Sequence, residues 1–334
     1  MNGYLHLNAS FLQSLLFAVV ISLFNGIAYA VHVPDALVET QWLEDNLSQV
    51  VVLDVRSDLK SFTSKPEFIK DKKTGKQRIA KIGGHIPGAS LVNFKEVRAD
   101  RKVGKKIFKN MLPEKSAFEK LLQIAGVNKN SSIVITSKGA SSSDVLMATR
   151  LYWQLKYYGH KDLAILNGGM AQWLLDNRKV STISKPPIQG DWVASTERDE
   201  LLATSEEVVE ASLQTKADQL IDVRPIGQYL GTHKSSSVSA FGHISAARNF
   251  PTELLFTDEL PIKVTSKQQA VQLVNALNIK IEEDKIVYCN TGKMASGGWF
   301  FFSEVLGYKN TQLYDGSMHQ WTHEGRPSVT MVME

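Results

Sequence analysis

The sequence predicts an α/β fold in which two similar domains follow one another, each a mostly parallel sheet flanked by helices. The first observation is that short apolar runs, typical of buried strands, alternate with segments of helical spacing. The second is a duplication, because three landmarks of the first half recur in the same order in the second, at a period far too long for a solenoid. The matched segments are residues 52–56 with 220–224, 84–86 with 242–244, and 159–173 with 307–321.

The composition is that of a folded, soluble protein. Of 334 residues, 43% are hydrophobic and 22% are charged, and this length suggests two domains of ordinary size. The net charge of +4 is too small to indicate a nucleic-acid partner, and a single cysteine cannot form an internal disulfide. The predicted organisation is a signal peptide (1–30), a first domain (31–180), a linker (181–199) rich in proline at its start, and a second domain (200–334).

The N-terminal segment has the pattern of an export signal. Residues 15–24 (L-L-F-A-V-V-I-S-L-F) are uninterrupted apolar residues, too few to span a bilayer, which takes about 20. Ala28-Tyr29-Ala30 is the small-x-small pattern of a signal peptidase site. We therefore predict export to the periplasm, cleavage after Ala30 and no membrane span in the mature chain. An uncleaved anchor is the alternative, because residues 1–14 contain no lysine or arginine.

Apolar runs and helical spacing locate the elements of the first copy. Strands are expected at residues 50–55, 133–135 and 164–166, and helices at 37–47, 144–158 and 170–175. The turn at 84–89 leads into an apolar stretch at 90–94. Residues 57–81 are polar and lysine-rich, and we expect a surface excursion there. Residues 95–109 carry seven basic residues against two acidic ones. We interpret this basic segment as a solvated face, and the alternative is a docking surface for an acidic partner or an anionic substrate.

The stretch at 285–302 contains the only cysteine, Cys289. Residues 286–288 are typical of a short buried strand, and 299–306 are apolar enough for a helix packed on a sheet. Cys289 should therefore lie where a strand ends and a loop leads to a helix N-terminus. Backbone N–H groups of such a loop favour an anion, so the thiolate form should be favoured as well. This predicts a reactive thiol, and the alternative is a buried structural cysteine. Thr136 takes the equivalent position in the first copy, which we therefore expect to be inactive.

Four features together resemble the rhodanese superfamily. They are a strand ending in D-x-R, a G-H-I turn, a cysteine-led loop after a buried strand, and D-G-S-x-x-x-W near the end. Two copies with a cysteine only in the second are similar to the tandem thiosulfate and 3-mercaptopyruvate sulfurtransferases. The resemblance implies transfer of a sulfane sulfur from a small anionic donor to a thiol or cyanide through a persulfide on Cys289, without a cofactor or a metal. A protein acceptor is a further partner that this leaves open.

The resemblance also implies roles for individual residues. The loop after the cysteine would surround the transferred sulfur with backbone N–H groups, and Lys293 would add positive charge unless it is an exposed loop residue. Asp222 and Arg224 are interpreted as a structural ion pair, and His243 as a residue that stabilises its turn. Arg248 is expected to face the substrate anion. The expected loop residues are Asn290, Thr291, Gly292, Lys293, Met294 and Ala295.

Two departures leave the identity of the donor open. The thiosulfate enzymes carry an arginine where residues 227–231 (G-Q-Y-L-G) have Gln228, and a lysine where this loop has Thr291. A cysteine phosphatase needs an arginine six residues after the cysteine, and Ala295 at that position excludes this class.

Two other classes remain as alternatives. A cysteine hydrolase would need a histidine partner, for which His319 and His323 are candidates. An exported, non-enzymatic carrier would hold a persulfide or a soft metal on Cys289 for delivery to a partner.

Overall fold

The computed structural model describes residues 31–70, 72, 75, 77–213, 219–280, 284–308 and 310–331. The expected signal peptide, residues 1–30, lies outside them. Within these ranges, there is no helix of the length and apolar character needed to cross a membrane.

The first copy is built on a parallel sheet with the strand order β1-β9-β8-β2-β5. The central strands β2 and β8 are continuous apolar runs, and every residue of β8 is buried, as expected for a strand covered on both faces. The strands are β1 (Leu37–Val38), β2 (Val50–Arg56), β5 (Ser90–Asn93), β8 (Ser132–Thr136) and β9 (Leu163–Leu166).

The second copy repeats this arrangement in a smaller parallel sheet, with the order β11-β10-β12-β13. In each sheet the strand that contains the aspartate of D-x-R, β2 or β10, lies beside the strand that ends at Thr136 or just before Cys289, β8 or β12. The two sheets therefore confirm the predicted fold class. The strands are β10 (Leu220–Asp222), β11 (Arg248–Asn249), β12 (Lys285–Tyr288) and β13 (Thr311–Leu313).

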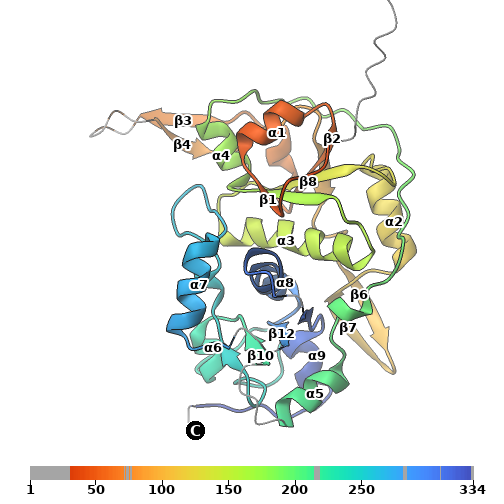
Figure 1. Ribbon diagram of the computed structural model, residues 1–334, viewed down its shortest axis with the longest axis vertical. Coiled ribbons are helices and arrows are strands. Elements are labelled where there is room, and N and C mark those ends of the chain that lie inside the picture. The colour runs from red at the N-terminus through yellow and green to blue at the C-terminus, as the bar shows by residue number, and fades with distance from the viewer. Residues whose placement is uncertain are drawn as a thin grey trace, which may run out of the picture. The chain divides into compact units, whose positions relative to one another are not determined.

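Helices cover the sheets, and two of them join the copies. Helix α3 begins with a capping box formed by Ser141 and Asp144 and is buried along almost its whole length. It lies beside α8 at the centre of Figure 1, between the two sheets. The α-helices are α1 (Thr40–Asn46), α2 (Lys115–Ile124), α3 (Ser142–Tyr157), α4 (Gly169–Leu175), α5 (Ser205–Leu213), α6 (Ile226–Leu230), α7 (Lys267–Ala276), α8 (Lys293–Phe300) and α9 (Ser317–His323). Single turns form η1 (Leu59–Phe62), η2 (Asp199–Leu201) and η3 (Thr252–Leu254), and α8 continues as a π-helical turn, η4 (Phe301–Val305).

Two antiparallel hairpins extend from the first copy. The expected surface excursion contains an exposed pair, β3 (Glu67–Lys70) and β4 (Gln77–Lys81). The basic segment forms β6 (Ala99–Val103) and β7 (Lys106–Met111), a hairpin that was not expected from the sequence.

The basic segment is not only a solvated face, and that interpretation was wrong in part. Its second strand reaches the second copy, where the Lys109 N–H donates to His319 Nε2 at 3.2 Å. Phe108 is buried with its ring edge-on to His319, and the Lys106 ammonium donates to the His323 carbonyl. Because alternate residues of a strand face opposite ways, Lys106 and Phe108 share the side of β7 that faces α9, whereas Ile107 lies on the other side and is exposed.

The segment at 181–199 has no α-helix and pairs only at one bridge, between Ser181 and His85. It is held against the first copy at Ser181 and again from Gly190 to Arg198, whereas residues 183–189 are exposed. Trp192 is 2% exposed, and its indole N–H donates to His160 Nδ1 at 3.1 Å. The proposed domain boundaries remain predictions.

Candidate functional site

Cys289 directly follows β12 and is 1% exposed. The loop after it turns at Gly292, whose φ of 80° requires a residue without a Cβ, and α8 begins at Lys293. The structure thus places the thiol at the carboxyl end of a central parallel strand, beside a helix N-terminus. Ligand sites of open α/β sheets lie at this end of the strands.

The D-G-S motif holds the cysteine loop in place. The Cys289 N–H donates to Ser317 Oγ at 3.0 Å, and the Cys289 carbonyl accepts from the Met318 N–H at 3.0 Å. One residue further, the Asn290 carbonyl accepts from the His319 N–H at 2.9 Å. The Ser317 hydroxyl in turn donates to the Tyr314 carbonyl at 2.8 Å. The first turn of α9 therefore fixes the backbone on both sides of the thiol.

Gln228, the residue that departs from the thiosulfate-enzyme pattern, contacts this loop. The Asn290 side-chain NH₂ donates to Gln228 Oε1 at 2.9 Å. The amide oxygen of Asn290 is buried and has no hydrogen-bond partner among the described residues. Gln228 thus orients a loop side chain instead of supplying a positive charge.

The thiol lies in a cavity of about 410 Å³ whose walls come from both copies. The first copy contributes Arg98, from the start of the basic segment, and Ser142 and Ser143, from the first turn of α3. The second copy contributes Cys289 and most of the loop after it, including Asn290, Thr291, Lys293 and Met294. Gly292 and Ala295, which were also expected at the site, do not line the cavity.

Two cations from different copies face the thiol. The Lys293 ammonium donates to Ser143 Oγ at 2.8 Å, so it is a site residue and not a free surface lysine. Burial lowers the pKa of Lys293, and Arg98 lowers it further, while Cys289 acts in the opposite direction. Burial, then the charge of Arg150, likewise lowers the pKa of Arg98, and Asp315 and Cys289 oppose this. These shifts indicate that an anion in the cavity would relieve repulsion between positive charges.

The sequence did not identify Arg98 as a site residue. Its guanidinium lies 4.4 Å from the centre of the Phe94 ring, which fixes its position. Its buried Nε has no hydrogen-bond partner among the residues that the structure describes. The available signal was the alternative interpretation of residues 95–109 as a surface for an anionic substrate.

A buried ion pair between the copies lies under the loop. Arg150, on α3, donates to Asp315 Oδ1 at 2.6 Å, and the two side chains are 0% and 3% exposed. The other Asp315 oxygen accepts from the Leu112 N–H at 2.6 Å. A Cβ at Gly292 would lie 2.5 Å from Asp315 Oδ1 and 2.7 Å from Arg150 Nη1. The loop therefore passes this pair so closely that only glycine fits.

Asp222 and Arg224 form the kind of ion pair expected of them. Both are fully buried, and Arg224 Nη2 donates to Asp222 Oδ2 at 2.7 Å and to the Gly242 carbonyl at 2.8 Å. This ties the end of β10 to the G-H-I turn. In that turn, the His243 ring stacks on Tyr229 and its Nδ1 lies 2.7 Å from the Tyr229 carbonyl.

Arg248 does not line the cavity, so the expectation that it faces the substrate is not met in this structure. It lies on β11, and its Nη2 donates to the Leu277 carbonyl at 2.7 Å, at the end of α7. Nearness in sequence to the G-H-I turn suggested its role, but the strand directs its side chain elsewhere. Arg98 is the arginine that the fold brings to the cavity.

The two histidines considered for a hydrolase are engaged elsewhere. His319 Nε2 accepts from the Lys109 N–H, so Nδ1 carries the proton and donates to the Ser237 carbonyl at 2.6 Å. His323 Nδ1 lies 2.7 Å from the His319 carbonyl. Neither ring lines the cavity at Cys289, and this arrangement does not support a thiol–imidazole pair.

Comparison with known proteins places the chain in a family. The model of the rhodanese-like domain matches residues 39–176 and 205–324. The thiosulfate sulfurtransferase of Cricetulus griseus is 26% identical over 296 residues, which cover 88% of this chain and 94% of that protein. The sulfur carrier protein TtuD of Thermus thermophilus is 27% identical over 300 residues, with 86% and 94% covered.

A solved structure supports the same assignment at the level of the fold. SseA from Escherichia coli, described as a 3-mercaptopyruvate sulfotransferase, superposes with a TM-score of 0.66 at 21% identity. The superposition covers 85% of this chain and 98% of SseA. The chain therefore belongs to the rhodanese family, as a tandem-domain sulfurtransferase.

Proposed function

We propose that the protein moves a sulfane sulfur from a small anionic donor to a thiol or cyanide acceptor through a persulfide on Cys289. The observation that carries the proposal is the cavity that places this thiol beside two cations, Arg98 and Lys293. The donor is thiosulfate, 3-mercaptopyruvate or a related compound, and each of these is an anion that carries a transferable sulfur. Arg98 and Lys293 would hold the anionic end while the sulfur points at Cys289.

In the first half-reaction the Cys289 thiolate attacks the outer sulfur of the donor. A new S–S bond forms on Cys289, the old bond to that sulfur breaks, and the leaving group departs with its electron pair. Thiosulfate would release sulfite, and 3-mercaptopyruvate would release the enolate of pyruvate, which takes up a proton. In the second half-reaction the acceptor attacks the outer persulfide sulfur and restores the Cys289 thiolate, so neither an external oxidant nor a cofactor is required.

The loop stabilises the charge that stays on sulfur. The first N–H groups of α8 have no carbonyl partner within the helix, and they lie at its positive end beside Cys289. Such donors favour a thiolate and a persulfide anion without rearrangement during the reaction. Asn290, Thr291 and Met294 complete the wall around the outer sulfur.

The test is turnover combined with the intact mass of the protein. Incubation with thiosulfate should add one sulfur, about 32 Da, which a thiol should then remove. Addition of cyanide should give continuous release of sulfite. Cys289→Ser should abolish both signals, whereas Thr136→Ser, at the equivalent position of the first copy, should keep them. If Cys289→Ser retained turnover, the proposal would be wrong.

A carrier function is the second candidate, because one relative is named a sulfur carrier protein. A carrier would take up one sulfur per Cys289 and then stop until a specific protein acceptor arrived. The parent protein with thiosulfate and excess cyanide distinguishes the two. Many equivalents of sulfite indicate an enzyme, and a single equivalent indicates a carrier.

Export to the periplasm is part of the proposal. It is supported by the apolar run at 15–24 and the Ala28-Tyr29-Ala30 pattern. The intact mass of protein from the periplasmic fraction tests it, because cleavage after Ala30 leaves a chain that starts at Val31. A retained segment 1–30 would indicate the anchored alternative.

A further inference from the structure

The copy without a cysteine has a cavity of its own, of about 550 Å³. It lies at the carboxyl ends of β2 and β8, the neighbouring strands that correspond to β10 and β12 at the Cys289 cavity. Thr136 replaces the cysteine there, and its hydroxyl is buried and bonded to the Ser137 carbonyl. This position therefore offers no nucleophile, although the fold still leaves a space above the strand ends.

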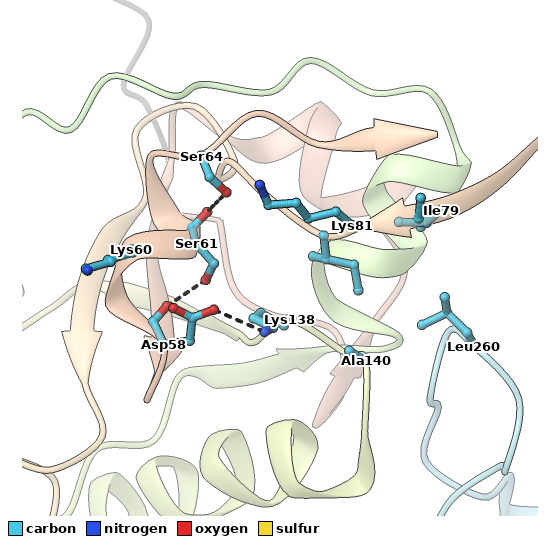
Figure 2. Close-up of a pocket in the computed structure, with 11 residues that line it drawn as sticks. Asp58, Lys60, Ser61, Ser64, Ile79, Lys81, Lys138, Ala140 and Leu260 are labelled. Atoms are coloured by element: carbon cyan, nitrogen blue, oxygen red, sulfur yellow. Dashed lines mark hydrogen bonds and ion pairs between the residues drawn. The ribbon is translucent and has the colours of Figure 1, made fainter. Parts of the chain in front are cut away.

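One side of this cavity is polar and positively charged. Lys60, Lys81 and Lys138 line it, against a single carboxylate, Asp58. Figure 2 shows the Lys81 ammonium directed toward Ser64 and Ser61, and the Lys138 ammonium beside Asp58. Lys60 contributes charge from the rim, because its amine points away from the others in this view.

The lysines are held only weakly by the protein. The contact between Lys138 and Asp58 is 3.5 Å long, and Asp58 is more than half exposed. Lys81 pairs at 3.2 Å with Glu67, and both side chains are more than half exposed. Exposed pairs of this kind contribute about 0–1 kcal/mol, so an anion in the cavity can compete for both ammonium groups.

The opposite side of the cavity is apolar. Ile79 and Ile82 come from β4 and the residues after it, and Ala140 from the loop after β8. Leu260 comes from the second copy and closes the cavity from the side opposite the lysines (Figure 2). The Ile262 N–H donates to the Gly139 carbonyl at 3.0 Å and holds this loop in place.

We propose that this cavity is a binding site for a small organic anion, a sulfonate or a carboxylate on an apolar body. Lys81 and Lys138 hold the anionic group, and the isoleucines and Leu260 pack against the body. A volume of about 550 Å³ is within the range of ligand pockets and far exceeds what an inorganic anion such as sulfite needs. The site has no residue in common with the Cys289 cavity, so it does not depend on the proposed sulfur transfer.

The test uses 4-bromobenzenesulfonate with the full chain, by isothermal titration calorimetry and by anomalous diffraction from soaked crystals. The bromine should appear in the cavity of the first copy. Lys81→Gln and Lys138→Gln should each weaken binding about tenfold or more, because a charge-assisted hydrogen bond is lost. A neutral analogue, 4-bromophenyl methyl sulfone, should bind more weakly than the sulfonate by a similar factor.

Two matched controls separate this site from general attraction to a basic protein. Lys65→Gln removes one exposed charge from the same surface without touching the cavity, and affinity should stay within about twofold. Arg98→Gln removes a cation from the Cys289 cavity and should also leave this binding unchanged. A bromine found only at Cys289 or nowhere, or affinity unaffected by Lys81→Gln and Lys138→Gln, would overturn the proposal.

Discussion

The buried ion pair between the copies allows a sharp test of how they are held together. Asp315→Asn keeps the shape of the side chain and can still accept from the Leu112 N–H, but it removes the negative charge. Arg150 then remains as a cation that is 0% exposed. Its Nε and Nη2 have no hydrogen-bond partner among the described residues, so Asp315 is the main compensation for its charge.

The expected loss of stability follows from this geometry. Two unit charges about 4 Å apart attract by about 4 kcal/mol at the effective dielectric constant of such sites. Removal of one partner from a buried pair typically costs about 3–5 kcal/mol, because the other charge stays desolvated. The free energy of unfolding should therefore fall by about 3–5 kcal/mol, a large part of the 5–15 kcal/mol that is usual for a folded protein.

Urea unfolding of parent and variants measures this effect. Tryptophan fluorescence and far-ultraviolet circular dichroism should be followed together, because the free energy is defined only if the two transitions coincide. Arg150→Met combined with Asp315→Asn removes the stranded charge, and should be more stable than Asp315→Asn alone by about 1–4 kcal/mol. If Asp315→Asn cost less than about 1 kcal/mol, or if the double variant were no more stable than the single one, the pair would not hold the copies together.

Three further predictions concern Arg98 at the site, the pH dependence of stability through His160, and the packing of Gly298 on α8. Arg98→Gln should raise the KM for thiosulfate about tenfold, measured from initial rates of sulfite release. Lys102→Gln, which removes an exposed charge from the neighbouring strand β6, should leave the KM unchanged. Equal KM values for the parent and Arg98→Gln would contradict the role of Arg98. Burial lowers the pKa of His160 below its unfolded value of about 6.5, so the unfolded chain binds more protons and the free energy of unfolding should fall as the pH drops below about 6.5. His160→Gln should flatten this dependence in urea titrations between about pH 7.5 and 5.5, and an unchanged slope would contradict it. In Gly298→Ala, the new Cβ would lie 2.7 Å from side-chain methyl groups of Val223 and Val287. The free energy of unfolding should fall, because overpacking costs about 1–3 kcal/mol and the gain in helix propensity is only about 0.5–1 kcal/mol. A urea midpoint above that of the parent protein would contradict this.

The fold was predictable from the sequence because its central strands are unusually clear. β2 and β8 are buried on both faces, so they appear as continuous apolar runs, and the duplication provided a second set of the same landmarks. The hairpin of β6 and β7 was missed for a physical reason. Its strands are rich in lysine, and its burial comes from a contact with α9, which lies far away in the sequence.

The candidate site was predictable only where its residues are neighbours in the chain. The loop from Cys289 to Ala295 follows directly from a strand end and a glycine turn. Arg98 belongs to the other copy, and no local pattern connects it with the thiol. Gln228 was noticed as a departure, but its contact with Asn290 required the structure. Arg248 is the opposite case. It lies close to the G-H-I turn in sequence, but its side chain is directed away from the cavity.

The contact between α3 and α8 has a consequence for the origin of the chain. The two helices are equivalent, since each follows the strand that carries the cysteine position, and Thr149 Oγ1 of one lies 3.1 Å from Ser296 Oγ of the other. An interface in which both partners use the same element is of the isologous type found in twofold homodimers. The tandem chain thus has the arrangement of a fused dimer, in which each half forms part of the other's site. After such a fusion one half can lose its thiol and still be needed as a wall of the working site.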